Sequence, residues 1–112
     1  MMINRQTAWL QGPRFDTCGF LNANEGIKWV IGEILEEYLR AKDKYFFPDD
    51  VVHAAAIVSE ESGELVRAAN NTYYDDTPEH RLNLLEEAVQ TGAMAIRFLE
   101  HIGSFKSKEQ QQ

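Results

Sequence analysis

Residues 77–103, TPEHRLNLLEEAVQTGAMAIRFLEHIG, decide the fold. Thr77 is a favourable helix N-cap, Pro78 suits the first helical position, and Gly103 suits the residue after a helix. Between these positions, apolar side chains recur at intervals of three and four residues along one side, namely Leu82, Leu85, Val89, Ala93 and Ile96. The segment therefore predicts one long amphipathic helix.

Two further helices are predicted upstream of this segment. The first begins at Asn22, where Glu25 completes a capping box, and it fades within residues 42–47. The second starts around Pro48, Asp49 and Asp50, where a proline and two acids suit a first helical turn, and Asn70 and Asn71 are its plausible ends. Because the sequence has no alternating strand pattern and no glycine-rich phosphate loop, the expected fold class is all-α.

One helical domain with an extension at each end is the predicted organisation. The domain covers residues 22–103, an N-terminal arm covers 1–21, and a flexible tail covers 104–112. The arm forms either a short extra helix or an extension that packs on a neighbouring chain. Since two faces of the last helix are apolar, we expect antiparallel helices whose four-helix-bundle core is completed in a homodimer or homotetramer. Gly92 within that helix indicates close approach of another helix.

Composition excludes several classes of protein. With 112 residues, of which 44% are apolar and 26% charged, the chain has the size and balance of one globular domain. Its net charge of −7 argues against nucleic-acid duplexes as partners, and its one cysteine, Cys18, excludes an internal disulfide. The apolar runs are too short to cross a bilayer and no targeting segment is evident, so we expect no membrane partner and a cytoplasmic location.

Acidic side chains occupy helix positions where apolar residues are expected. Glu61 and Glu64 share one face of the second predicted helix with apolar neighbours, and Glu87 and Gln90 repeat their three-residue spacing on the third. Two carboxylates 4 Å apart repel by about 4 kcal/mol at an effective dielectric of 20, so a convergent cluster needs a positive charge. Mg²⁺, or Mn²⁺ in its place, suits oxygen ligands and bridges carboxylates to phosphates. The alternative is a solvated helix face.

These residues also carry a resemblance to a known family. The segment from Val52 to Leu99, with EESGE at 60–64 followed by EAVQ at 87–90, resembles the all-α nucleoside triphosphate pyrophosphatases of the MazG-like superfamily. That family has a Glu-Glu-x-x-Glu motif on one helix and a Glu-x-x-Asp motif on the next. The resemblance implies Mg²⁺-dependent hydrolysis of a nucleoside triphosphate between the α and β phosphates, which yields a monophosphate and pyrophosphate.

The resemblance also implies roles for individual residues. Glu61, Glu64 and Glu87 are expected to hold Mg²⁺, and Glu60, catalytic together with Glu61, is an outer ligand or orients the attacking water. Gln90 stands where the family has aspartate, so it offers Mg²⁺ a carbonyl oxygen without a charge. It either serves as a weaker ligand or satisfies a buried polar network. The substitution leaves a second function open, a catalytically silent helical module that binds a nucleotide or a protein.

Substrate contacts are predicted from position along the helices. Arg97 and Met94 share the polar arc of the last helix with the acidic residues, and Arg97 is the favoured phosphate contact. Lys44 is a second candidate for the phosphates, and Asn71 is expected to face the base. Alternatively, Arg97 forms an ion pair with Glu86 or Glu100 on its own helix. Candidates that would stack on a base from another subunit, or else serve only in packing, are Trp29, Tyr73 and Tyr74.

Overall fold

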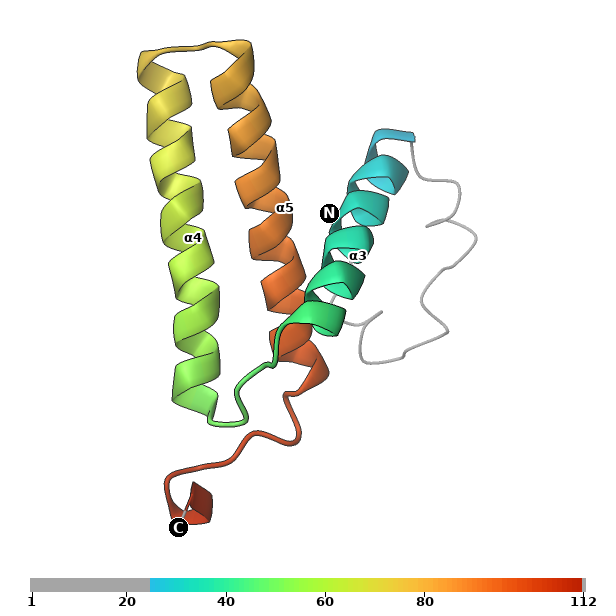
Figure 1. The fold of residues 1–112 in the computed structure, drawn as a ribbon, viewed down its shortest axis with the longest axis vertical. Helices are drawn as coiled ribbons and strands as arrows, with labels where there is room; N and C mark the ends of the chain where they lie inside the picture. Colours follow the sequence, from blue (N-terminus) through green and yellow to red (C-terminus); the bar gives the residue numbers. More distant parts are fainter. Residues whose placement is uncertain (1–24, 112) are drawn as a thin grey trace, which may run out of the picture. The chain divides into compact units, whose positions relative to one another are not determined.

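A computed structural model describes residues 25–111 of the chain, which form three α-helices and one short 3₁₀ helix (Figure 1). These are α3 (Glu25–Lys44), α4 (Val51–Tyr74), α5 (Pro78–Glu100) and the 3₁₀ helix η2 (Glu109–Gln111). The described residues contain no strand, which confirms the all-α class. The predicted arm at 1–21 and the predicted cap Asn22 lie outside the described residues.

The chain divides into two units, residues 1–31 and residues 32–112. The second unit contains the C-terminal part of α3 together with α4 and α5. Helices α4 and α5 run antiparallel side by side and are joined by a short turn (Figure 1). None of the helices in residues 25–111 is both long enough and apolar enough to cross a membrane.

The start of α4 is set by a side-chain cap. The Asp50 carboxylate accepts hydrogen bonds from the backbone N–H groups of Val52 at 3.3 Å and His53 at 3.2 Å. Because this cap fixes the first turn, the helix begins at Val51, directly after the predicted start around Pro48, Asp49 and Asp50. Its end also lies beyond the prediction, since α4 continues through Asn71 to Tyr74.

The predicted start of α5 is confirmed. The Thr77 hydroxyl accepts a hydrogen bond from the His80 N–H at 3.1 Å, and Pro78 is the first helical residue. The helix ends at Glu100, and residues 101–104 continue as turns around Gly103. Thr77 and Pro78 therefore define the start of α5 more closely than Gly103 defines its end.

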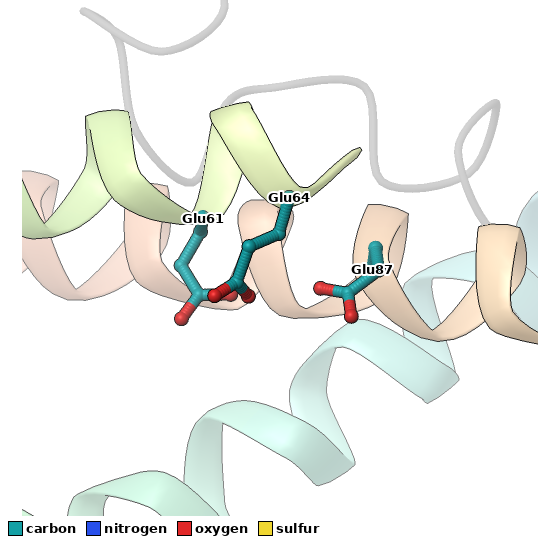
Figure 2. A group of neighbouring side chains, drawn as sticks. All are labelled: Glu61, Glu64 and Glu87. Carbon is teal, nitrogen blue, oxygen red and sulfur yellow. The ribbon is translucent and has the colours of Figure 1, made fainter. Parts of the chain in front are cut away.

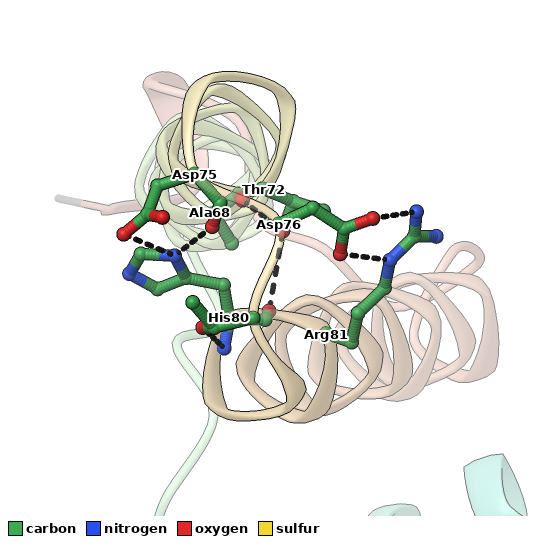
Figure 3. Close-up of polar contacts among 7 residues, drawn as sticks. Ala68, Thr72, Asp75, Asp76, His80 and Arg81 are labelled. Atoms are coloured by element: carbon green, nitrogen blue, oxygen red, sulfur yellow. Dashed lines mark hydrogen bonds and ion pairs between the residues drawn. The ribbon is translucent and has the colours of Figure 1, made fainter.

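A turn network holds α4 and α5 in register (Figure 3). The Thr72 hydroxyl lies 2.9 Å from the Ala68 carbonyl oxygen and 3.2 Å from that of His80. The His80 Nδ1 lies 2.6 Å from the Asp75 carbonyl oxygen. Beside them, the Arg81 guanidinium donates to both carboxylate oxygens of Asp76, at 2.8 and 2.9 Å. The turn therefore limits sliding of one helix along the other, which fixes the relative height of the residues further down the hairpin.

Small side chains dominate the core of the second unit. Its buried apolar residues are Ala41, Phe47, Ala54, Ala68, Ala93 and Met94. At Gly92 an added Cβ would lie 3.1 Å from the Cδ1 atom of Ile34, so another helix does approach closely there, as the sequence predicts. Small residues let helices pack closely but bury little apolar surface each, so larger side chains stay outside.

Large apolar side chains remain exposed along α4 and α5, among them Val52, Val66, Leu82, Leu85 and Leu99. An apolar groove of about 560 Å³ also opens on this pair of helices. Its lining residues are Ala55, Val58, Ser59, Ser62, Ala95, Phe98 and Leu99. The described residues thus leave apolar area uncovered on the helices that carry the acidic residues.

The C-terminal tail contacts the start of α4. The Lys106 N–H donates to the Asp49 carbonyl oxygen at 2.7 Å, and the Lys106 ammonium lies 3.3 Å from the Asp49 carboxylate. The Phe105 ring packs 4.7 Å from the Phe98 ring, measured between centroids. These contacts tie the segment that was predicted to be a flexible tail to the end of the helical hairpin.

Candidate metal centre

Three glutamates converge from two helices in the middle of the hairpin (Figure 2). Glu61 and Glu64 lie one turn apart on α4, and Glu87 faces them from α5. One carboxylate oxygen from each residue lies within 4.8 Å of the other two, and all three residues are half-buried. We call Glu61, Glu64 and Glu87 the glutamate cluster.

Two oxygens of the cluster are buried without a partner. Oε1 of Glu61 and Oε1 of Glu87 are both shielded from solvent, and neither has a hydrogen-bond partner. Buried polar atoms in native proteins are nearly always satisfied, and a buried carboxylate oxygen without a donor is costly. Glutamates often cluster on helices without a ligand. The unpartnered buried oxygens, more than the clustering, therefore make the cluster a candidate site for a cation.

The pKa values of Glu61 and Glu87 are raised, as expected for carboxylates with little positive charge nearby. Burial raises the pKa of the Glu61 carboxyl, and the nearby carboxylates of Glu64 and Glu87 raise it further. Burial likewise raises the pKa of Glu87, with Glu64 as the next contributor, while Arg67 opposes the shift. Ionised carboxylates in this cluster are thus held at a free-energy cost. A divalent cation would offset that cost, since its charge favours the ionised form.

Thr91 links the two helices beside the cluster. Its hydroxyl lies 2.8 Å from the Glu87 carbonyl oxygen on its own helix and 3.2 Å from the Glu61 carbonyl oxygen on α4. The contact joins the backbones of two cluster residues, so it sets their separation. Sequence reasoning missed Thr91, because a threonine one turn after Glu87 gives no indication of what its hydroxyl reaches.

A cavity of about 480 Å³ is lined by Glu61 of the cluster together with other predicted site residues, whereas Glu64 and Glu87 are not among its described lining residues. Glu60, Glu61, Gln90, Met94 and Arg97 all line it. Its other lining residues, from α3, the α3–α4 loop and α4, are Glu37, Arg40, Ala41, Tyr45, Phe46, Phe47 and Ile57. We call this space the first cavity. It contains carboxylates, an amide, two arginines and aromatic rings, which is a suitable set of groups for a polar ligand with a flat ring.

Arg97 donates to backbone carbonyl oxygens in the described structure, and its assignment as a phosphate contact stays a prediction. It is only 5% exposed, and its guanidinium donates to the carbonyl oxygens of Ala41 at 3.5 Å and Tyr45 at 2.8 Å. The guanidinium also lies 4.9 Å from the centre of the Phe47 ring. Of the predicted ion-pair partners, Glu100 pairs instead with Lys42 at 3.2 Å. Arg97 therefore holds the end of α3 and a wall of the first cavity.

Two predicted substrate contacts lie apart from this cavity. Lys44 is exposed, with its ammonium 5.8 Å from the centre of the Tyr45 ring, and it is not among the described residues that line the cavity. Asn71 is exposed near the end of α4, where its carbonyl oxygen accepts a hydrogen bond from the Asp75 N–H at 3.0 Å. Their assignments as phosphate and base contacts stay predictions.

Two of the aromatic residues named for base stacking, Tyr73 and Tyr74, are also not among the described residues that line this cavity. Tyr73 and Tyr74 are 80% and 82% exposed at the end of α4 and pack edge to face on each other at 4.9 Å. Trp29 belongs to the first unit. In contrast, Phe46 is 90% exposed and lines the first cavity. Sequence reasoning missed Phe46 because it lies in a loop, outside any helical pattern.

No family model, no curated protein and no solved structure matches this chain. The glutamate cluster and the first cavity are therefore interpreted from their own chemistry.

Proposed function

We propose that the chain is a Mg²⁺-dependent nucleoside triphosphate pyrophosphohydrolase of the MazG-like superfamily. In this proposal a nucleoside triphosphate is cleaved between the α and β phosphates to give a monophosphate and pyrophosphate. One observation carries it, namely the convergence of the Glu61, Glu64 and Glu87 carboxylates, two of which have a buried Oε1 without a hydrogen-bond partner. Such oxygens fit a hard divalent cation, Mg²⁺ or Mn²⁺.

The chain's own residues divide the work of the proposed reaction. The glutamate cluster would hold the cation, which when bound would neutralise the carboxylates and polarise phosphoryl oxygens. Glu60 is exposed and lines the first cavity next to Glu61, a suitable place for a carboxylate that accepts a hydrogen bond from the attacking water. Gln90 lines the same cavity and offers a neutral carbonyl oxygen. Most of the catalytic effect would come from position and charge.

The apolar surface left uncovered on α4 and α5 supports the second part of the proposal, a homodimer or homotetramer. Pairing of two such hairpins along the apolar groove would complete a four-helix bundle and cover Phe98 and Leu99. The glutamate cluster lies on the same two helices. Assembly would therefore reinforce the scaffold that positions the carboxylates.

Release of pyrophosphate tests the function directly. Purified protein is incubated with Mg²⁺ or Mn²⁺ and a panel of nucleoside triphosphates, and pyrophosphate and monophosphate are measured. We expect release by the unaltered chain, none by Glu61→Gln, and unchanged release by Glu109→Gln, an exposed carboxylate in η2. A chain that releases no pyrophosphate with either metal and any triphosphate would contradict the proposal.

A catalytically silent module is the second candidate, and Gln90 is the residue that favours it. An amide at this position brings no charge to the cluster, so a weaker metal site and loss of turnover would follow. Under this candidate the chain binds Mn²⁺ or a nucleotide but releases no pyrophosphate, and Gln90→Asp restores release or tightens metal binding. The two candidate functions thus use the same cavity for binding, and they differ in whether the chain hydrolyses what it binds.

A further inference from the structure

Arg40 lies where two cavities meet. A second cavity of about 600 Å³ borders α3 and α5, and of the described residues that line it only Glu37, Arg40 and Gln90 also line the first cavity. Arg40 is the one cation of the three. Arg40 therefore lines the same cavity as Glu61, one member of the glutamate cluster.

The other cations near the cluster are less suited to meet a ligand. Arg97 also lines the first cavity, but its guanidinium is buried and donates to two backbone carbonyl oxygens. Lys44 is absent from the described lining of either cavity. Arg67 is exposed and acts on Glu87 through its charge, but it too lines neither cavity. Of these cations, Arg40 is the one that is both exposed and part of the described lining of the two cavities.

The present partner of Arg40 is an exchangeable anion. Its Nε donates to Oε1 of Glu37 at 2.9 Å, and its Nη2 donates to Oε2 of the same carboxylate. The Arg40 side chain is 51% exposed and that of Glu37 is 17% exposed, so the guanidinium is the more accessible partner of this pair. A guanidinium fork that matches a carboxylate also matches two phosphoryl oxygens. Glu37 thus occupies the position that a phosphate oxygen pair would take.

We infer that Arg40 is the substrate-binding residue that contacts the phosphates, and that it exchanges the Glu37 carboxylate for phosphoryl oxygens when the ligand enters. The inference rests on the proposed function and names the residue that recognises the polyphosphate. It also answers a charge problem. The described lining of the first cavity includes three carboxylates, Glu37, Glu60 and Glu61, which repel a polyphosphate unless a mobile cation lies among them.

Binding of tripolyphosphate in the presence of Mg²⁺, measured by calorimetry, tests the inference without requiring turnover. We expect Arg40→Gln to weaken binding by about tenfold or more, since a bidentate charged contact is lost. The matched control is Arg81→Gln, which removes an equally bidentate arginine pair, with Asp76, at the α4–α5 turn. That control is expected to stay within about twofold of the unaltered chain. Arg40→Lys should recover part of the affinity, because it keeps the charge and loses the fork.

A second variant keeps the test valid if Arg40→Gln fails to fold. Glu37→Gln removes the competing carboxylate while Arg40 stays in place, and we expect it to tighten tripolyphosphate binding. Affinity that is unchanged in Arg40→Gln, or unchanged in Glu37→Gln, would overturn the inference. Pyrophosphate release is measured on the same samples. If the chain hydrolyses triphosphates and Arg40→Gln leaves KM unaltered, the inference fails and the proposed function stands. If no hydrolysis occurs but tripolyphosphate binding depends on Arg40, the proposed function fails and the anion site stands.

Discussion

Replacing Glu61 by glutamine should stabilise the metal-free protein while it removes the proposed metal site. The glutamine side chain would keep the shape of the glutamate, remove one negative charge from the glutamate cluster, and supply an N–H donor to the remaining carboxylates. Catalytic and binding groups that repel one another in the empty site commonly lower stability, and their removal restores it. The sign of the effect therefore separates a binding site from a solvated helix face, for which no change in stability is expected.

The magnitude follows from the geometry. At the 4.8 Å limit of the oxygen separations, an effective dielectric of 20 gives a repulsion of about 3.5 kcal/mol for each ionised pair. The carboxylates are half-buried, so solvent reduces this to about 1 kcal/mol for each pair. Glu61 takes part in two pairs, with Glu64 and with Glu87. We expect Glu61→Gln to raise the free energy of unfolding by about 1–2 kcal/mol and Tm by about 4–10 °C.

Urea and thermal unfolding followed by circular dichroism, at pH 7 with and without EDTA, measure this effect. Mg²⁺ at a hundred times its Kd adds about 2.7 kcal/mol to a protein that binds it only when folded, so the unaltered chain should gain stability and Glu61→Gln should not. Glu109→Gln, in exposed η2, is the control and should match the unaltered chain in both buffers. If Glu61→Gln is less stable in EDTA and still gains stability from Mg²⁺, the cluster is no cation site.

Three further predictions concern pH, the interhelical link and assembly. The pKa values of Glu61 and Glu87 are raised in the fold above the ordinary 4.5, so the destabilisation is absent below pH 4.5 and complete above the raised values. The metal-free chain should thus lose stability as pH rises through that window, and Glu61→Gln should lose less in urea titrations at each pH. Thr91→Val removes the hydroxyl that links Glu61 and Glu87, and it should lower stability by about 0.5–1.5 kcal/mol and weaken Mn²⁺ binding in calorimetry, whereas unchanged values would show the link to be dispensable. Leu99→Asp places a charge in the apolar groove and should shift sedimentation to a smaller species, unlike Ile102→Asp, an exposed residue outside the groove.

Sequence patterns predicted best the helix ends that are set by a capping side chain or a proline within one turn. Thr77 and Pro78 define the start of α5 because a hydroxyl cap and a proline act within one turn. Asp50 shows how far the same reasoning reaches, since the sequence places the start of α4 around Pro48, Asp49 and Asp50 but does not select Asp50 as the cap. The side chain that caps is chosen by backbone geometry at the loop, which periodicity does not describe.

The site was predictable as far as helical spacing extends. Spacing places Glu61 and Glu64 on one face, and similar spacing marks Glu87, so their convergence was within reach once α4 and α5 were taken as neighbours. Arg97 shows the limit. A helical wheel gives its direction from the axis of α5 but not that the end of α3 would cover it and take its donors. Arg40 was missed for the same reason, since its importance arises only from the cavities that its neighbours create.

Gln90 bears on how many cations such a site would hold. The three carboxylates of the glutamate cluster carry a formal charge of −3 when ionised, and one divalent cation reduces it to −1. A fourth carboxylate at position 90 would leave −2 around one ion and so favour a second. An amide supplies an oxygen without that charge, and in a half-buried site each uncompensated charge is costly. Under the proposed function, Gln90 thus suits a centre with a single cation.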